Sequence, residues 1–123
     1  MMNEIVEPVN LGISEENHKW LKRFKEEHIF SEMRDAYKFA VAYAIAKDLN
    51  IKDITSKETV FGIATIDPTK ELYFAISSLR PMENEAKYHI LEMLADAGMT
   101  ELVKEYQQNK LNLAQIIADI DRE

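Results

Sequence analysis

The chain has 123 residues, which is within the ~100–200 residues that one domain usually occupies. Because 46% of the residues are hydrophobic, a core can form without a disulfide or a metal to stabilise it. The absence of cysteine excludes thiol nucleophiles, cysteine-ligated zinc and iron–sulfur clusters, and three glycines are too few for a glycine-rich phosphate-binding loop. We expect a single domain over residues 1–123, with residues 1–8 as a loosely ordered lead-in.

The net charge of −7 is unevenly distributed along the chain. Residues 1–13 carry two acidic groups, residues 14–50 carry seven groups of each sign, and residues 51–123 carry eight basic and thirteen acidic groups. A nucleic-acid-binding domain usually has a net basic surface or a basic stripe. This distribution disfavours general binding to polyanions, and it suits a protein partner with a basic surface that meets the carboxy-terminal half.

Two features of the chain bear on its location. No apolar run approaches the ~20 residues that a membrane-spanning helix needs. The first residues, Met-Met-Asn-Glu, lack the basic region of a secretory signal peptide. We expect a cytoplasmic protein without a membrane segment.

The first elements that the pattern predicts are a short strand and a helix. Residues 9–13 alternate between apolar and small or polar side chains, which is typical of a half-buried strand. Ser14 is a good N-cap for a helix over about residues 15–27, whose first turn carries two glutamates that the helix dipole favours. This helix would place Trp20, Leu21, Phe24 and His28 on one side.

A second helix, over residues 32–49, is apolar on more than one face. Eight consecutive residues, 39–46, carry no charge. A helix that is apolar all round is buried all round, so we expect it to be the central element or to lie in a subunit interface. The residues of the second face, which form either a dimer interface or part of the core, are Phe39, Ala42, Tyr43 and Ala46.

The carboxy-terminal half predicts several further helices. Residues 59–66 are rich in β-branched side chains and fit either a short strand or a short helix, which the sequence does not separate. Asp67-Pro68 predicts a helix start, with that helix running to about residue 79. A helix over residues 84–97 should end at Gly98, Thr100 should cap another, and Asn112 should cap the last. The expected fold class is therefore mainly α. We expect a compact multi-helix domain with one short amino-terminal strand, and a second short strand near 59–66 is one of the two alternatives for that segment.

The sequence contains no recognisable catalytic or metal-binding motif. The three histidines never form the H-x-x-x-H pair of a helical zinc site, and no activated-serine motif occurs. The adjacent acids at 15–16 and 26–27 lie at expected helix ends, where solvation and the helix dipole account for them. We expect no enzyme activity, no catalytic residue, no cofactor and no metal.

The order of elements over residues 9–50, a strand followed by two helices, is that of a ribbon–helix–helix unit. This is the basis of an alternative, a DNA-binding transcriptional regulator with contacts from Asn10, Lys19, Lys22 and Arg23. However, the first helix contains i,i+4 pairs of opposite charge, such as Glu15–Lys19 and Arg23–Glu27, which are typical of an ordinary solvated face.

Two blocks of the sequence resemble small proteins associated with bacterial DNA phosphorothioation (Dnd) systems. The first, residues 34–44, reads Arg-Asp-Ala-Tyr-Lys-Phe-Ala-Val-Ala-Tyr-Ala and resembles an alanine-rich helix with aromatic residues. The second, residues 90–99, reads Ile-Leu-Glu-Met-Leu-Ala-Asp-Ala-Gly-Met and resembles an acidic helix that runs into a glycine stop. The order and spacing of the blocks agree, so that the resemblance covers roughly residues 15–110.

The chain also departs from that family in two places. The family's second block favours Glu-Tyr-Ala-Asn-Gly-Gly, whereas residues 92–98 here read Glu-Met-Leu-Ala-Asp-Ala-Gly. Its basic, glycine-containing stretch after the first block is replaced by Lys-Asp-Leu-Asn at 47–50. The resemblance implies a prokaryotic cytoplasmic accessory protein linked to DNA modification or phage defence, and it assigns no catalytic residues. Together with the residue patterns, it leads us to expect a non-catalytic interaction protein that forms a homodimer.

Overall fold

The structure is a computed structural model that describes residues 7–79, 85–108, 115–118 and 120. In chain order its labelled elements are β1 (Asn10–Ser14), α1 (Glu15–Glu26), α2 (Met33–Ala46), β2 (Lys57–Gly62), α3 (Ile63–Ile66), α4 (Glu71–Leu79) and α5 (Lys87–Gln108). The expected fold class, mainly helical with a short amino-terminal strand, is confirmed. Within the described ranges, no helix is both long enough and apolar enough to cross a lipid bilayer.

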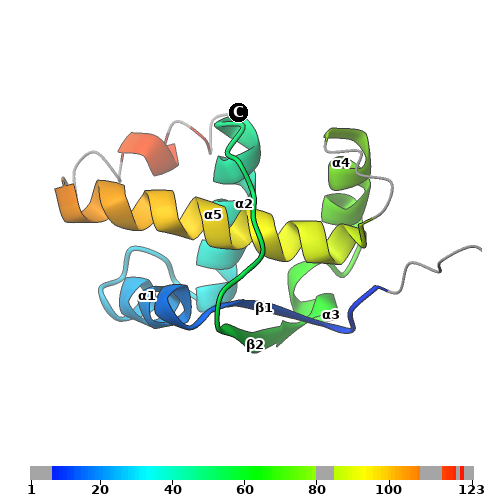
Figure 1. Ribbon diagram of the computed structural model, residues 1–123. Coiled ribbons are helices and arrows are strands. Elements are labelled where there is room, and N and C mark those ends of the chain that lie inside the picture. The colour runs from blue at the N-terminus through cyan, green and yellow to red at the C-terminus, as the bar shows by residue number, and fades with distance from the viewer. Residues whose placement is uncertain (1–6, 80–84, 109–114, 119, 121–123) are drawn as a thin grey trace, which may run out of the picture.

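The long helix α5 is the axis around which the other elements are arranged (Figure 1). The helix α2 crosses α5, and this crossing is the most extensive contact between two elements. The helix α1 and the antiparallel β1–β2 sheet lie below α5 in the view of Figure 1, whereas α4 rises above its amino-terminal end. The core between these elements includes the fully buried Leu11, Ile13, Leu21, Phe24, Tyr37, Ala40, Leu91, Leu94, Met99 and Leu102.

The helix α1 confirms the predicted start at Ser14 and ends sooner than expected. The Ser14 hydroxyl accepts a hydrogen bond from the Asn17 N–H at 3.3 Å, as an N-cap does. After Glu26 the chain leaves the helix through His28, which has a φ of 60° and is exposed. The prediction that His28 belongs to the apolar side of this helix is wrong, because its left-handed backbone turns it out of the helix.

The helix α2 confirms the predicted helix over 32–49, although it is not buried all round. Phe39 is 9% and Tyr43 is 5% exposed, and both belong to the core of the chain itself. Ala42 and Ala46, in contrast, are exposed. The helix ends at Ala46, and Asp48 follows in a left-handed conformation with a φ of 50°.

Residues 57–66 contain both of the structures that the sequence left open. The strand β2 pairs with β1, with Leu11 opposite Phe61 and Ser14 opposite Lys57, and α3 follows it directly. The predicted helix start at Asp67-Pro68 is wrong by several residues, because a turn that includes Lys70 at a φ of 62° precedes α4. Asp67 still caps this helix, since its carboxylate accepts the Leu72 and Tyr73 N–H groups, each at 3.0 Å.

The prediction that Gly98 ends a helix and that Thr100 starts another is also wrong. The helix α5 continues through both residues, and the Thr100 hydroxyl donates to the Asp96 carbonyl of the same helix at 3.0 Å. Gly98 has a packing role instead, because a Cβ there would overlap the carbonyl group of Ala40 on α2. The predicted cap Asn112 lies outside the described residues.

Candidate functional site

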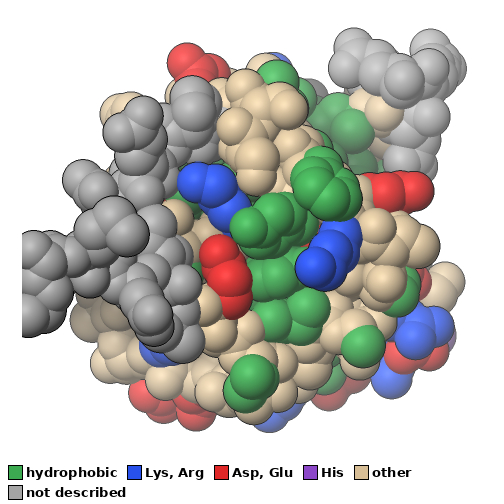
Figure 2. All heavy atoms as spheres, turned by 90° about the vertical axis from the view of Figure 1, so that its right-hand side faces the viewer, with side chains coloured by type: hydrophobic (Ala, Val, Ile, Leu, Met, Phe, Trp, Pro, Cys, Tyr) green, Lys and Arg blue, Asp and Glu red, His purple; other side chains and the backbone are tan. Residues whose placement is uncertain are grey.

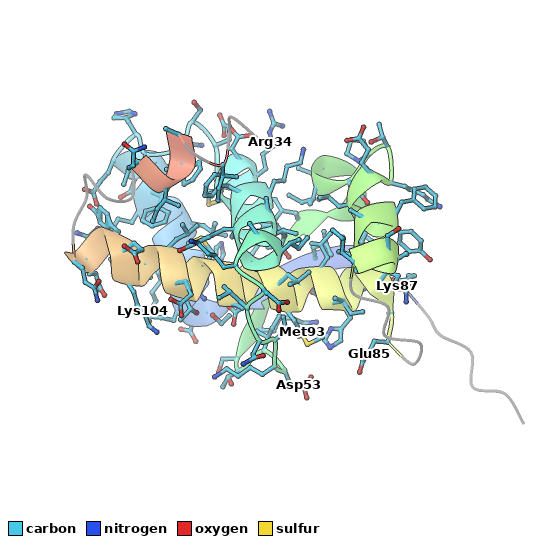
Figure 3. All side chains as sticks on the ribbon, turned by 90° about the horizontal axis from the view of Figure 1, so that it is seen from above. Arg34, Asp53, Glu85, Lys87, Met93 and Lys104 are labelled. Carbon is cyan, nitrogen blue, oxygen red and sulfur yellow. The ribbon has the colours of Figure 1, made fainter. Side chains whose placement is uncertain are left out.

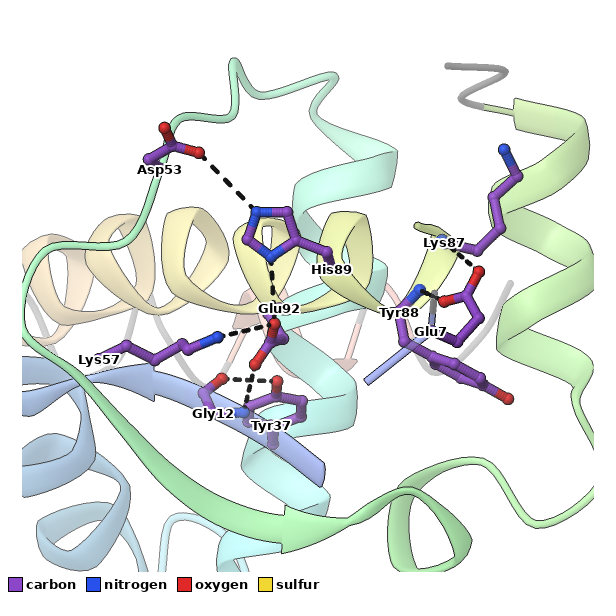
Figure 4. A network of polar contacts seen from close by, with 9 residues as sticks. All are labelled: Glu7, Gly12, Tyr37, Asp53, Lys57, Lys87, Tyr88, His89 and Glu92. Atoms are coloured by element: carbon purple, nitrogen blue, oxygen red, sulfur yellow. Dashed lines mark hydrogen bonds and ion pairs between the residues drawn. The ribbon is translucent and has the colours of Figure 1, made fainter. Parts of the chain in front are cut away.

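In the described part of the chain, side chains rather than a third strand occupy the edge of β1 that β2 does not cover (Figure 4). The Gly12 N–H donates to Glu92 Oε2 at 2.7 Å, the Ser14 N–H donates to Asp96 Oδ1 at 3.1 Å, and the Tyr37 hydroxyl donates to the Gly12 carbonyl at 2.8 Å. Alternate strand residues are about 6.6–6.8 Å apart, and helix residues four apart are separated by about 6 Å along the axis. The two acids of α5 therefore match the two N–H groups of β1.

Glu92 is the centre of a polar cluster of four residues, which we call the Glu92 cluster: Glu92, Lys57, His89 and Asp53. Glu92 is 1% exposed, and its Oε1 lies 3.3 Å from Lys57 Nζ and 3.2 Å from His89 Nδ1. His89 Nε2 in turn lies 3.8 Å from Asp53 Oδ1 (Figure 4). A buried carboxylate is costly unless it is paired and hydrogen-bonded, and Glu92 meets both conditions.

A cavity of about 410 Å³ opens beside the Glu92 cluster, between the start of the described chain and the first turn of α5. Besides Lys57, His89 and Glu92, its walls include the carboxylates of Glu7 and Glu85. His89 and Glu92 are a titratable pair in its wall, and among the described residues that line it there is no serine, threonine or tyrosine.

Two further acids, Glu7 and Asp67, also accept backbone N–H groups at helix starts. Glu7 accepts the Lys87 and Tyr88 N–H groups at the start of α5, each at 2.9 Å. Asp67 accepts the Tyr88 hydroxyl at 2.9 Å in addition to the start of α4. Burial, followed by this hydrogen bond, raises the pKa of Tyr88 to about 12. These acids have structural roles in joining α4 and α5 to the rest of the molecule.

Residues 47–56 cross α5 on the way from α2 to β2 (Figure 1). A groove lies along this side of α5. It consists of two cavities of about 410 and 470 Å³, which share the lining residues Lys52, Asp96 and Thr100. Figure 3 shows Asp53, Met93 and Glu85 on this side of α5, with Arg34 on the opposite side. We call this feature the α5 groove; its charged lining residues are Glu15, Glu16, Asp53, Asp96 and Glu101 against Lys19 and Lys52, a formal charge of −3.

The residues that the sequence assigned to DNA contact are spread over α1 and the start of β1. Asn10 is exposed opposite Gly62, and Lys22 is exposed on α1. Lys19 Nζ lies 4.0 Å from Glu15, and Arg23 Nε lies 2.7 Å from Glu27. The guanidinium of Arg23 also stacks 4.8 Å above the Trp20 ring, and its hydrogen bond with Glu27 raises its pKa. The expected i,i+4 pairs are therefore present.

The four residues assigned to a dimer or core interface are separated by the fold. Phe39 packs against Phe30 and Tyr43 inside the chain, with ring centroids 5.5 and 6.5 Å away. Ala42 and Ala46 face outward on α2. The structure thus divides this set into two core residues and two surface residues.

Sequence reasoning missed Glu92, Asp96, His89, Glu7 and Asp67 as members of polar clusters. One signal was present, because Glu92 and Asp96 are four residues apart in a stretch whose neighbours Leu91, Met93, Leu94 and Ala95 are apolar. Acids on a buried helix face need donors from another element, but the donors lie about 80 positions away in the sequence. Only the folded chain shows which donors these are.

No group of three or more histidine or acidic side chains in the described ranges has the arrangement of a metal site. Comparison of the chain with protein-family models, curated proteins and solved structures found no match.

Proposed function

We propose that this chain is a non-catalytic accessory protein that binds a partner protein through the α5 groove. The observation that carries the proposal is the formal charge of −3 on two adjoining cavities, within a chain whose net charge is −7. A groove lined mainly by one sign of charge attracts segments of the opposite sign. The partner that fits is a protein segment rich in lysine or arginine.

The roles of the acids inside the molecule support a non-catalytic function. Glu7, Asp67, Glu92 and Asp96 each accept backbone N–H groups of other elements, so they are committed to holding the fold. A catalytic acid or base must instead be free to exchange a proton with a substrate. Pairing by structural donors explains the clusters without invoking a reaction.

The two sequence blocks that resemble Dnd-associated proteins support a proposal for the cellular process in which this binding takes place. We propose a cytoplasmic protein of a bacterial DNA-modification or phage-defence locus, where a basic, DNA-handling protein would be a suitable partner. We also propose that the chain forms a homodimer, which is supported by apolar side chains that remain on the surface of α2 and α4, among them Ala42 and Phe74.

The alternative, a ribbon–helix–helix regulator, is favoured by the order β1–α1–α2 and by the exposure of Asn10 and Lys22. Against it, β1 pairs with β2 of the same chain, and α5 and α2 side chains occupy its other edge. A regulator of that class pairs the equivalent strand with a second copy of itself. We therefore rank this alternative below the interaction protein.

The test is the binding of a fluorescent peptide of about ten lysine and arginine residues, followed by anisotropy at low and physiological salt. The double variant Asp53→Asn/Glu101→Gln removes two charges from the groove. Since exposed charge pairs contribute about 0.2–1 kcal/mol each, the dissociation constant should rise by about twofold to thirtyfold at low salt. The matched control Glu26→Gln/Glu71→Gln removes two exposed charges elsewhere and should have a clearly smaller effect.

Two results would contradict the proposal. One is the absence of peptide binding at low salt, and the other is an equal response of the two double variants. Tight binding of random duplex DNA at physiological salt, with a steep salt dependence, would favour the regulator instead.

A further inference from the structure

The first cavity of the α5 groove has the form of a pocket for one side chain. Its α5 wall consists of Met93, Asp96, Ala97, Thr100 and Glu101, which recur at the spacing of a single helix face. The opposite wall is the crossing segment 49–52. Its volume of about 410 Å³ is at the lower end of the range of about 300–1,000 Å³ that small-molecule sites occupy. We call it the Asp96 pocket.

The lining of the Asp96 pocket has an apolar region and an acidic region. Leu49, Met93 and Ala97 provide the apolar surface, and Met93 itself is only 5% exposed. The carboxylates of Asp96 and Glu101 provide the acidic part. A ligand that suits both parts has an apolar stem that ends in a cation, as the side chains of arginine and lysine do.

Asp96 is held in place before any ligand arrives. Its Oδ1 accepts the Ser14 N–H at 3.1 Å and the Asn17 amide at 2.9 Å, and these bonds orient the carboxylate. Within the part of the chain that the structure describes, the other oxygen, Oδ2, accepts no hydrogen bond. A carboxylate that its own fold orients loses little entropy when it accepts a further donor.

We propose that the Asp96 pocket receives one arginine side chain of the partner, with its stem on Met93 and Ala97 and its guanidinium on Asp96 and Glu101. This rests on the proposed function and adds the chemistry of a single contact to it. Arginine suits the pocket better than lysine because the planar guanidinium is more weakly hydrated than an ammonium group and binds carboxylates with several donors.

Two cations of the chain compete with the incoming arginine. Lys52 lines the pocket from the crossing segment, and Lys104 Nζ lies 3.2 Å from Glu101 Oε1. Because both lysines reduce the attraction, an isolated arginine should bind weakly, and an arginine within a basic peptide should gain from the rest of the groove. Removal of Lys52 should therefore strengthen binding, whereas removal of Glu101 should weaken it.

The experiment is a titration with Nα-acetyl-arginine amide, followed by NMR of the methionine methyl groups, in which Met93 reports on the pocket. We expect a saturable shift of the Met93 signal, a smaller shift with the lysine analogue, and none with the citrulline analogue, which is neutral but similar in shape. The variant Glu101→Gln should weaken binding about twofold to fivefold, and Lys52→Gln should strengthen it by a similar factor, as expected for partly exposed charges. Glu26→Gln, outside the pocket, is the control.

A further variant separates this inference from the proposed function. Ala97→Leu fills the pocket without changing its charge, so it should abolish the Met93 shift while the basic peptide still binds with its dependence on salt. Circular dichroism checks that this variant folds. An unchanged arginine response in Ala97→Leu, or an equal response to the citrulline analogue, overturns the arginine pocket alone. The absence of peptide binding to the wild type overturns both.

Discussion

At the residue scale, Gly98 marks a close contact between α5 and α2, because a Cβ at this position would overlap the Ala40 carbonyl oxygen. Its missing side chain is what allows the Ala40 backbone to pack against α5. The helix continues through this glycine, although glycine costs about 1 kcal/mol relative to alanine in a helix interior. The close approach of two helices outweighs that local cost because it buries a large part of the core.

The variant Gly98→Ala should lower the free energy of unfolding by about 3 kcal/mol, because the new Cβ cannot fit without moving α2 away from α5. Urea unfolding monitored by circular dichroism measures this change. The control is Gly62→Ala, where the nearest atom to a new Cβ is Asn10 Oδ1 at 3.9 Å. That change should be within about 0.5 kcal/mol of the wild type. Equal effects of the two variants would contradict the packing role of Gly98.

His28 offers the opposite test, a residue whose replacement should stabilise the chain. It follows α1 with a φ of 60°, a region that costs a residue with a side chain about 1–2 kcal/mol and costs glycine little. His28→Gly should therefore raise the free energy of unfolding by about 1 kcal/mol, after the larger entropy of the unfolded glycine chain is taken into account. His28→Ala should give no such gain. Thermal unfolding of the three proteins decides, and a less stable glycine variant would refute this account.

At the scale of elements, side chains of α5 and α2 make hydrogen bonds to the β1 backbone that a neighbouring strand would otherwise make. Glu92 and Asp96 accept the N–H groups of β1, and the Tyr37 hydroxyl donates to its carbonyl. This arrangement gives hydrogen-bond partners to Gly12 and Ser14 on the side of β1 that β2 does not cover. It also ties the amino-terminal strand to the carboxy-terminal helix.

Removal of Glu92 should be costly for this reason. Glu92→Ala leaves the buried Gly12 N–H without its acceptor and Lys57 without its partner, so the free energy of unfolding should fall by about 1–3 kcal/mol. Tyr37→Phe should cost about 1 kcal/mol, because it removes one buried hydrogen bond. Glu101→Ala removes only the surface pair with Lys104 and should cost less than about 1 kcal/mol. Urea unfolding at neutral pH ranks the three, and an equal loss in all would contradict the edge closure.

The hydrogen bond from the Tyr88 hydroxyl of α5 to Asp67, which caps α4, predicts a loss of stability in alkaline solution. Burial raises the pKa of Tyr88 to about 12, from an unfolded value near 10. The folded state therefore keeps a proton that the unfolded state loses, so the stabilisation is complete below about pH 10 and is lost as the pH rises through 12. Unfolding curves between pH 8 and 12 should show this decline, and Tyr88→Phe should make it shallower. An identical pH profile for wild type and variant would contradict the assignment to Tyr88.

At the scale of the whole molecule, acidic charge and apolar surface are found on different faces. The α5 groove carries the acids, whereas Figure 2 shows hydrophobic side chains gathered on the face where α4 lies, with lysine or arginine on either side of them. Six of the nine residues of α4 are apolar, and part of this apolar surface is not covered, since Phe74 is 61% exposed. A charged face and an apolar face can serve separate contacts, one with a basic partner and one with a second copy.

The proposed homodimer gives the prediction at this scale. Light scattering at tens of micromolar should give a mass near 29 kDa, twice the 14.3 kDa of one chain. Ala42→Glu on α2 and Phe74→Glu on α4 each place a charge on exposed apolar surface, and the variant that halves the mass identifies the contact face. A mass near 14.3 kDa for the wild type would refute self-association, and it would leave the peptide test of the α5 groove unaffected.

The sequence by itself determined the features that depend on neighbours along the chain. The alternation at 9–13, the Ser14 cap and the uncharged run 39–46 predicted β1, the start of α1 and the helix α2, because each signal is complete within about a dozen residues. The i,i+4 pair Arg23–Glu27 was predictable for the same reason. These features require no knowledge of distant contacts.

Only the tertiary structure decided the features that depend on residues far apart in the sequence. A glycine at position 98 is typical of a helix end, but the carbonyl of Ala40 lies against Gly98 and the helix continues. The sequence does not show which donors Glu92 and Asp96 meet, and in the structure these are the N–H groups of Gly12 and Ser14. The physical reason is the same in both cases: a local preference of about 1 kcal/mol is outweighed when packing or a buried hydrogen bond with a distant element contributes more.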